Sequence, residues 1–235
     1  MLKVDLHAHV GGDPKDGIFI KYSPKQFIDF MAKKGYDVVA ITPHLENNYD
    51  KKLIDYAKGK GVLLIMGVEL DLEGKDVLVL NVPQDKLKDI TKIKDLEKIK
   101  AKDNLIIAPH PFYQLHSLGN KLVKNIDIFD AIEVCHFYTN KVNKKRNDKA
   151  ITIAKKYNKA LVANSDIHML EYFNEEHYSL VNSQKDIISI FNAIKGGKVE
   201  IRTKPLSFWV FTLKLVSLLK NSILHPQLLI RSFRH

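Results

Sequence analysis

The sequence contains little cysteine, and this limits how the fold can be stabilised. Cys135 is the one cysteine in 235 residues, so no disulfide can form within the chain. A reducing compartment fits this composition. No apolar signal-peptide region precedes the first strand-like segment, and we therefore expect a cytoplasmic protein.

The chain also lacks a hydrophobic run long enough to span a bilayer. The segment 206–219 is strongly apolar, but it is interrupted by Lys214 and falls short of the ~20 apolar residues that a membrane helix needs. We expect a catalytic domain over residues 1–204 and an apolar and basic helical extension over 205–235. This extension is predicted to pack on the domain or on a second copy of the chain, in a homo-oligomer. An interfacial membrane helix is the alternative.

Arginine is scarce although the chain is basic. The formal net charge is +10, from 37 basic and 27 acidic residues, and only four of the basic residues are arginine. A basic surface attracts phosphate-bearing partners, but arginine is the better bidentate phosphate ligand. Most of the lysines are therefore interpreted as a solvated surface. The sequence has no Walker loop, no Gly-x-Ser-x-Gly elbow and no Gly-x-Gly-x-x-Gly fingerprint.

Short runs of Val, Ile and Leu alternate with segments of helical periodicity. Most of the runs are apolar at successive positions, which is typical of strands buried on both faces of a parallel sheet. Ser23-Pro24 indicates a helix start, and Gly35 ends that helix. Strand–helix alternation predicts an α/β class. The expected strands are 3–6, 38–42, 62–68, 77–82, 105–108, 131–134 and 160–163, and the other expected helices are 48–60, 85–102, 143–157 and 184–195.

Histidines and acids recur just after these apolar runs. In a β/α barrel such positions converge on one rim, where active sites lie. A single histidine or aspartate there is more often structural, but the joint recurrence predicts metal binding. So many candidates exceed the needs of one structural zinc and favour a metal cluster with a bridging carboxylate. The residues are His7, His9, His44, Glu69, His110, Asp166 and His168.

The order of these motifs resembles the polymerase-and-histidinol-phosphatase (PHP) family over residues 1–204. The family's opening motif is similar to Asp-Leu-His-Ala-His at 5–9 followed by Asp-Gly at 16–17. Its later motifs are similar to Ile-Thr-Pro-His at 41–44, Gly-Val-Glu-Leu at 67–70, Ala-Pro-His-Pro at 108–111 and Ser-Asp-Ile-His at 165–168.

The resemblance implies a distorted seven-stranded, TIM-like β/α barrel with its metal site at the C-terminal rim of the strands. It implies two or three divalent ions (Mn, Zn or Fe) and hydrolysis of a phosphate ester by a metal-bound hydroxide. The expected catalytic residues are His7, His9, Asp166 and His168. By the same resemblance, His7, His9, Glu69 and Asp166 hold one ion, Glu69 and His110 hold a second, and Asp16, His44 and His168 hold a third.

Some positions depart from the family pattern or have two interpretations. Many members carry a further histidine on the strand after the glutamate motif, but the segment 76–81 has none. Asp13 and Asp16 both follow the histidine pair; Asp16 is predicted as the ligand and Asp13 as a structural turn residue. His136 is equally open to a substrate contact or to packing. Arg146 is a candidate substrate contact within a basic run that more often faces solvent.

Three functions compete at this point. The first is hydrolysis of a phosphomonoester or phosphodiester in a small molecule or nucleotide. The second is exonuclease action on short RNA or DNA, although no nucleic-acid module is evident. The third is a non-catalytic barrel subunit of a ribonucleoprotein or polymerase assembly. Such a scaffold would have lost ligands, and this chain keeps nearly all of them.

Overall fold

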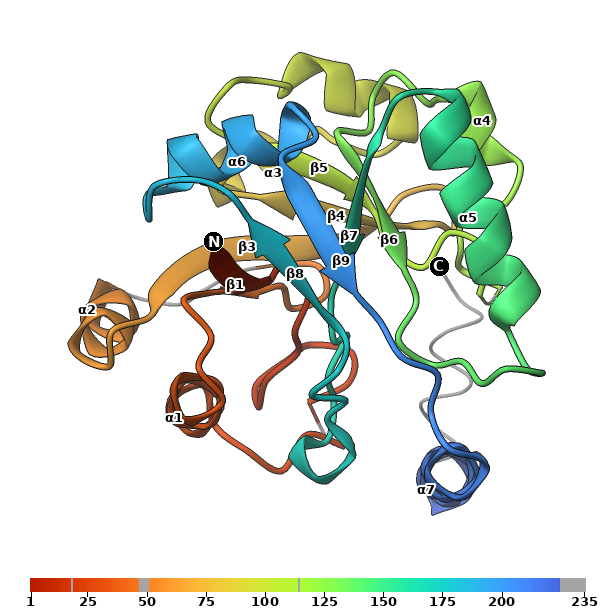
Figure 1. Ribbon diagram of the computed structural model, residues 1–235. Coiled ribbons are helices and arrows are strands. Elements are labelled where there is room, and N and C mark those ends of the chain that lie inside the picture. The colour runs from red at the N-terminus through yellow and green to blue at the C-terminus, as the bar shows by residue number, and fades with distance from the viewer. Residues whose placement is uncertain (18, 47–50, 114, 225–235) are drawn as a thin grey trace.

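The computed structural model describes residues 1–17, 19–46, 51–113 and 115–224, and its centre is one sheet of nine strands (Figure 1). The strand order is β7-β6-β5-β4-β3-β2-β1-β8-β9, and β9 lies beside β7, so the sheet is nearly closed into a barrel. The strands are β1 (Leu2–Asp5), β2 (Val38–Ile41), β3 (Leu63–Asp71), β4 (Asp76–Leu80), β5 (Leu105–Ala108), β6 (Ala131–Val134), β7 (Ala160–Ala163), β8 (Tyr178–Val181) and β9 (Val199–Arg202).

The strand pairing defines one common direction in this sheet. The pairs β1–β2, β2–β3, β5–β6 and β6–β7 are parallel, whereas β4 is antiparallel to both of its neighbours. Strand β8 is antiparallel to β1 and to β9. All strands except β4 and β8 therefore point the same way, and their carboxyl ends meet at one rim.

The predicted barrel shape is confirmed, but the predicted number of seven strands is wrong. The missed strands are β8 and β9, which lie between β1 and β7. Both strands differ from the continuous apolar runs. The sequence of β9 is Val-Glu-Ile-Arg, with its charged residues exposed, and β8 contains a polar serine. Such alternation is the pattern of half-exposed strands, whereas strands buried on both faces are apolar at successive positions.

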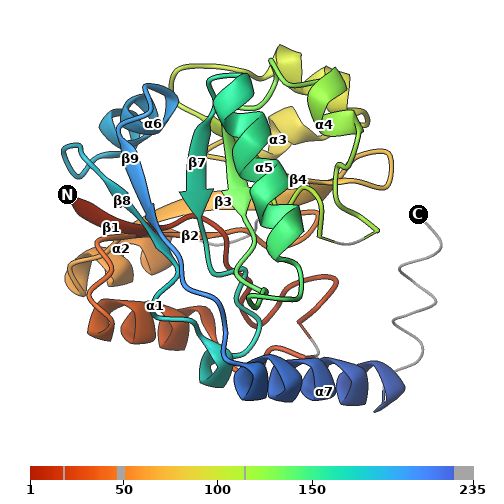
Figure 2. The same cartoon turned by 45° about the vertical axis from the view of Figure 1, so that its right-hand side comes forward.

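Helices cover the outside of the barrel (Figures 1 and 2). Ser23 caps α1 as predicted, with a capping box between Ser23 and Gln26. The helices are α1 (Pro24–Lys33), α2 (Lys51–Gly59), α3 (Gln84–Leu87), α4 (Lys121–Lys124), α5 (Lys144–Lys156), α6 (Ile187–Lys195) and α7 (Phe208–Leu224), with short 3₁₀ helices η1 (Ile93–Lys98) and η2 (Leu170–Tyr172).

The predicted continuous helix over 85–102 is wrong, because the segment forms only the short α3 and the 3₁₀ helix η1. Its buried residues are Leu87, Ile90, Ile93 and Leu96, which recur every third position. A spacing of three matches the 3₁₀ helix better than the 3.6-residue turn of an α-helix. Asp95 also accepts hydrogen bonds from the backbone N–H groups at positions 91 and 92, which starts a new turn there.

Hydrogen bonds between the segments that follow β1 and β7 close the rim. The N–H of Asp166 donates to the carbonyl of His7 (2.9 Å), and the N–H of His9 donates to the carbonyl of Ile167 (3.2 Å). The side chain of Asn164 accepts from the N–H of Leu6 at 2.9 Å. Residues 6–9 and 164–168 therefore form one rigid unit, although they are far apart in the chain.

An apolar layer fills the barrel below this rim. It includes Leu6, Ile65, Leu78, Ile107 and Val162, which are buried residues from five different strands or strand ends. Since alternate residues of a strand share a face, Glu69 lies on the same interior face of β3 as Ile65. Glu133 lies on the same face of β6 as Ala131, which belongs to this layer too. The interior thus changes from hydrocarbon to carboxylate towards the carboxyl ends of the strands.

Candidate metal centre

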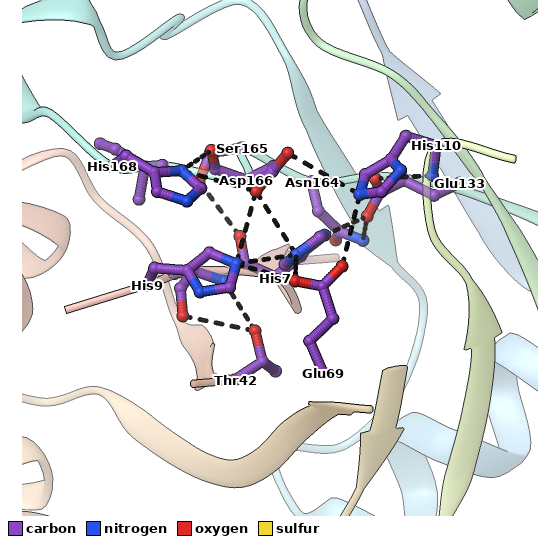
Figure 3. Close-up of polar contacts among 12 residues, drawn as sticks. His7, His9, Thr42, Glu69, His110, Glu133, Asn164, Ser165, Asp166 and His168 are labelled. Atoms are coloured by element: carbon purple, nitrogen blue, oxygen red, sulfur yellow. Dashed lines mark hydrogen bonds and ion pairs between the residues drawn. The ribbon is translucent and has the colours of Figure 1, made fainter. Parts of the chain in front are cut away.

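The carboxylate of Glu69 lies at the centre of four imidazoles. Its Oε2 is 3.1 Å from Nε2 of His44, 3.2 Å from Nε2 of His9 and 3.5 Å from Nε2 of His7. Its Oε1 is 3.4 Å from Nε2 of His110 (Figure 3). One buried carboxylate therefore faces the same ring atom of four histidines, and these histidines come from the ends of three strands.

Gly67 allows Glu69 to reach this position. It lies two residues earlier on β3, and a Cβ there would be 2.3 Å from a side-chain carbon of Leu80 on β4 and 3.0 Å from one of Thr42. A side chain at position 67 would therefore require Leu80 and Thr42 to shift. Glycine permits the close packing of β4 without that shift, so the Gly-Val-Glu motif has a steric basis as well as a chemical one.

Asp13 lies behind two of the imidazoles and fixes their orientation. Its Oδ2 is 2.9 Å from Nδ1 of His9, and its Oδ1 is 3.1 Å from Nδ1 of His44. The carboxylate also accepts from the N–H groups of Lys15 and Asp16, both at 2.9 Å. The turn predicted at Asp13 is present, but the same side chain directs Nε2 of both histidines towards Glu69. Carboxylates in this position orient histidine ligands and increase their basicity.

Glu133 does the same for His7, and the sequence reasoning did not identify it. Its Oε2 is 3.1 Å from Nδ1 of His7 and accepts from the amide of Asn164 at 2.8 Å. Its Oε1 accepts from the N–H of His110 at 3.2 Å. The available signal was an acid within the otherwise apolar strand Ala-Ile-Glu-Val, all four residues of which are buried. A buried carboxylate needs such partners.

The closing Ser-Asp-x-His segment brings Asp166 and His168 to the same centre. Oδ1 of Asp166 is 3.4 Å from Nε2 of His7 and 3.5 Å from Nε2 of His9. Nε2 of His168 is 3.2 Å from Oδ2 of Asp16. The ring of His9 stacks between those of His44 and His168, with centroid distances of 4.5 and 4.4 Å. The eight side chains predicted as ligands thus lie together, and their metal binding stays a prediction.

Backbone strain accompanies two of these residues. His110 has φ = 26° and Asp166 has φ = 44°, in the left-handed region that residues other than glycine seldom occupy. Such conformations persist where surrounding contacts enforce them, and they concentrate at functional sites. Here the contacts are the hydrogen bonds from the His110 N–H to Glu133 and from the Asp166 N–H to His7.

The charges of the cluster fit a site for cations. Burial alone would lower the pKa of His7 and His9, but their carboxylate neighbours, Asp166 and Glu133 beside His7 and Asp13 and Asp166 beside His9, raise both pKa values well above normal. Burial likewise favours the neutral form of Glu69, but the imidazoles of His7 and His44 hold its pKa well below its usual range. In the chain alone, protons on histidine offset the buried carboxylates. Divalent ions would replace those protons at the same nitrogen atoms.

The positions of the possible ligand atoms also fit a site for cations. Three groups of three residues offer ligand atoms within 4.8 Å of one another, and each group includes at least one acid. Within the described residues, Nδ1 of His110 is buried without a hydrogen-bond partner, and Oε1 of Glu69 makes no hydrogen bond besides its 3.4 Å ion-pair contact with His110. Nitrogen and oxygen donors of this kind suit Zn, Mn or Fe. The groups are His7–His9–Asp166, His7–Glu69–His110 and His9–Asp13–His44.

A further group of donors adjoins this centre on the hairpin between β3 and β4. Asp71, Asp76 and His116 also bring ligand atoms within 4.8 Å of one another. Asp71 and Asp76 are paired across the two strands, and Oδ1 of Asp76 is buried without a hydrogen-bond partner among the described residues. Asp76 begins the strand on which the sequence lacks the expected histidine, so a carboxylate is present in that segment.

A cavity of about 320 Å³ opens beside the metal centre, and it is lined by Asp16, Asp166 and His168. Its other walls include the aromatic side chains of Phe19, Tyr113, Phe137, Tyr172 and Phe173. This size and composition are typical of a small-molecule site.

The two predicted substrate contacts lie differently with respect to this cavity. His136 lines it, and burial followed by the charge of Lys214 holds the pKa of His136 well below normal, so its imidazole is neutral. Arg146 does not line it, and its guanidinium donates to the carbonyl of Tyr113. Both substrate contacts stay predictions.

Comparisons with known proteins support the fold but do not establish the function. No family model matches the chain. An uncharacterized protein from Methanocaldococcus jannaschii is 29% identical over 170 residues, which are 65% of this chain and 98% of that protein.

Two solved structures resemble the chain at low sequence identity. One, from Bacteroides vulgatus, is described as a two-domain protein containing predicted PHP-like metal-dependent phosphoesterase; it has a TM-score of 0.67 and 17% identity and covers 86% of this chain. This chain spans 64% of its length. An amidohydrolase from Chromobacterium violaceum with bound sulfate and no metal has a TM-score of 0.55 and 11% identity, over 84% of this chain and 97% of that one. At these identities the likeness establishes the fold alone.

The described part of the chain contains no helix that is both long and apolar enough to cross a membrane. The helix predicted in the tail is present as α7, and Phe211 and Lys214 on it are buried. The predicted cytoplasmic location, the pairing with a second copy of the chain and the domain boundary at 204/205 stay predictions.

Proposed function

We propose that this chain hydrolyses phosphate esters of small molecules or nucleotides, with two or three divalent ions held by the cluster around Glu69. The observation that carries the proposal is the convergence of Nε2 of four histidines on one buried carboxylate, with Asp166 on the adjoining side. Divalent ions bound there would lower the pKa of water and neutralise charge that develops on phosphate.

The chain's own residues have three roles in this proposal. Glu69 and Asp166 bring negative charge between imidazoles that come from different strands. Asp13 and Glu133 fix the rings of His9, His44 and His7 through their Nδ1 atoms, which keeps each Nε2 directed inward. The aromatic walls of the cavity exclude water from one side of the substrate and provide apolar contacts for its leaving group.

The cavity supports a small substrate over a nucleic-acid strand. Its volume of about 320 Å³ lies at the lower end of the range for small-molecule sites. Aromatic side chains of the cavity wall, such as Tyr113, provide apolar contacts for a base, which keeps nucleotides among the candidate substrates. The nearly complete set of candidate ligands counts against a purely structural subunit.

The test begins with metal analysis of the purified chain, followed by a panel of phosphate monoesters, cyclic nucleotides, nucleoside bisphosphates and short oligonucleotides. We expect hydrolysis of at least one small ester that stops on chelation and returns with Mn, Zn or Fe. His9→Ala should abolish this hydrolysis while the far-UV circular dichroism stays unchanged. Retention of activity together with full metal occupancy in His9→Ala would overturn the proposal.

A further inference from the structure

Among the residues of α7 whose side chains the structure describes, 208–216, Lys214 lies inward and several large apolar residues lie outward. Lys214 is only 6% exposed, whereas its neighbour Leu213 is 57% exposed and Trp209 is 74% exposed. Lysine is among the residue types that are almost never buried unless they are paired. A helix that packed only for its hydrophobic content would be turned the other way, so the position of Lys214 needs a separate explanation.

Aromatic packing fixes this orientation. Phe211 stacks on Phe137, which follows β6, with the ring centroids 4.4 Å apart. The N–H of Leu206 donates to the carbonyl of Tyr138 at 2.8 Å, just before the helix begins. Residues three apart lie on the same face of a helix, so anchoring Phe211 also turns Lys214 towards the barrel. Figures 1 and 2 both place α7 outside the barrel, beyond the end of β9.

The inward face of α7 borders the cavity of the metal centre. Lys214 lines that cavity together with Asp16, Asp166 and His168. The aromatic side chains of Phe137 and Phe173 line it as well. One cavity therefore has candidate metal ligands on one side and a single lysine from the last described helix on another.

The ammonium group of Lys214 has no partner of opposite charge within the described residues. No ion pair or hydrogen bond joins it to them, even though Asp166 is close enough to influence it electrostatically. Burial lowers the pKa of Lys214 to about 8, while Asp166 acts in the opposite direction. His136 and His177, the imidazoles that feel its charge, have lowered pKa values, mainly because of burial, and are neutral. A largely buried cation without an ionic partner is costly, and an anionic ligand would reduce that cost.

We propose that Lys214 binds an anionic oxygen of the substrate, so that α7 forms part of the active site. The ligand class is a small phosphate ester, with its phosphate between the metal centre and α7 and its apolar portion against Phe137 and Phe173. Lysine suits this role because it contacts phosphate as a compact charge without a fixed geometry. The choice of phosphate as the anion rests on the proposed function, but the presence of an anion site at Lys214 does not.

The test measures binding of inorganic phosphate to the full metal-loaded chain by calorimetry, for the wild type and three variants. Lys214→Met removes the charge but keeps an apolar side chain of similar length, so the fold should tolerate it. Lys214→Arg restores the charge. Lys204→Met is the matched control, because Lys204 is exposed and pairs with Glu176 at 2.8 Å. Metal content is measured for each protein.

We expect Lys214→Met to weaken phosphate binding by about tenfold or more, the usual effect of losing a hydrogen bond to a charged group. Lys214→Arg should recover most of that loss, and Lys204→Met should bind phosphate like the wild type, all with unchanged metal content. With a hydrolysed ester, Lys214→Met should raise KM more than it lowers kcat. A purely structural lysine would change the melting temperature and leave phosphate affinity as it was.

The outcomes separate this inference from the proposed function. Phosphate binding that depends on Lys214, in a chain that hydrolyses no ester, would refute the phosphoesterase and leave the anion site in place. Hydrolysis with the same KM and the same phosphate affinity in Lys214→Met would refute the anion site and leave the phosphoesterase. A wild-type chain that binds no phosphate would also refute the role of Lys214.

Discussion

The two sides of the cavity, the strand ends and α7, differ in whether their polar groups have partners. On the strand side most polar atoms have a partner: Asp13 holds two histidines, Glu133 holds a third, and Glu69 faces four. On the α7 side one stacked aromatic pair anchors the helix, and the inward-facing Lys214 has no ionic partner among the described residues. The strand ends thus form a preorganised cluster, whereas α7 offers a charge that awaits a ligand. Substitutions on the strand side should therefore affect metal content, and those on α7 should affect ligand affinity alone.

The largest effect should come from Glu69→Gln. This change removes the charge that faces all four Nε2 atoms, so we expect loss of bound metal and a fall in kcat/KM of about a thousandfold or more, ~4 kcal/mol of transition-state stabilisation. Metal content by mass spectrometry and activity on the best ester check both effects. Glu200→Gln is the matched control, because Glu200 is exposed and pairs with Arg202 at 3.2 Å. Full metal content in Glu69→Gln would contradict the expectation that the strand side determines metal binding.

A smaller effect, on metal affinity, is expected for Asp13→Asn. Asparagine keeps an oxygen that can accept the backbone N–H groups of the turn, but it loses the charge that orients His9 and His44. Removing such a partner typically lowers metal affinity by ~10–100-fold. Competition with a chromogenic chelator measures this affinity, and Asp29→Asn on the exposed surface of α1 is the control. Equal affinities in the two variants would mean that Asp13 serves the turn alone.

The smallest effect should appear in the pH dependence of the metal-free chain. Burial alone would lower the pKa values of His44 and His110, but Glu69 and the other nearby carboxylates raise both to about 9. A raised pKa stabilises the fold fully below the ordinary histidine value of ~6.5, and this contribution is lost as the pH rises through about 9.

The melting temperature of the metal-free chain should therefore fall between these two pH values. Bound ions replace the histidine protons, so the metal-loaded chain should not show this fall. Thermal denaturation of both forms across this range is the measurement. Parallel curves for the two forms would show that the histidines of the strand side do not bind the metal.

Much of the strand side could be predicted because its signals are local. The apolar runs 105–108, 131–134 and 160–163 match β5, β6 and β7, and the polar residues that follow such runs meet at the rim. The roles of Asp13 and Glu133 were harder to predict from the sequence, because they depend on which ring nitrogen each carboxylate faces. That is a property of the folded rim and cannot be read from spacing. Strands β8 and β9 were missed because half-exposed strands mix polar and apolar residues.

The α7 side could not be predicted beyond the existence of a helix. Lys214 interrupts an apolar run, and in the sequence it is informative only as an obstacle to membrane insertion. Its burial depends on the stacking of Phe211 on Phe137, a contact between residues that are 74 positions apart. Helical periodicity does not reveal which face of a helix will be turned inward when most of its residues are apolar.

The seam that joins the segments after β1 and β7 has a consequence for biosynthesis. Asn164 and Leu6 are 158 residues apart, and the hydrogen bond between them lies beside ligands contributed by both segments. During translation, the first two histidines emerge long before Asp166 and His168 exist. A nascent chain therefore cannot assemble the full ligand set until His168 has been made. Metal binding should therefore occur late in folding, after strands that are far apart in the sequence have paired and closed the barrel.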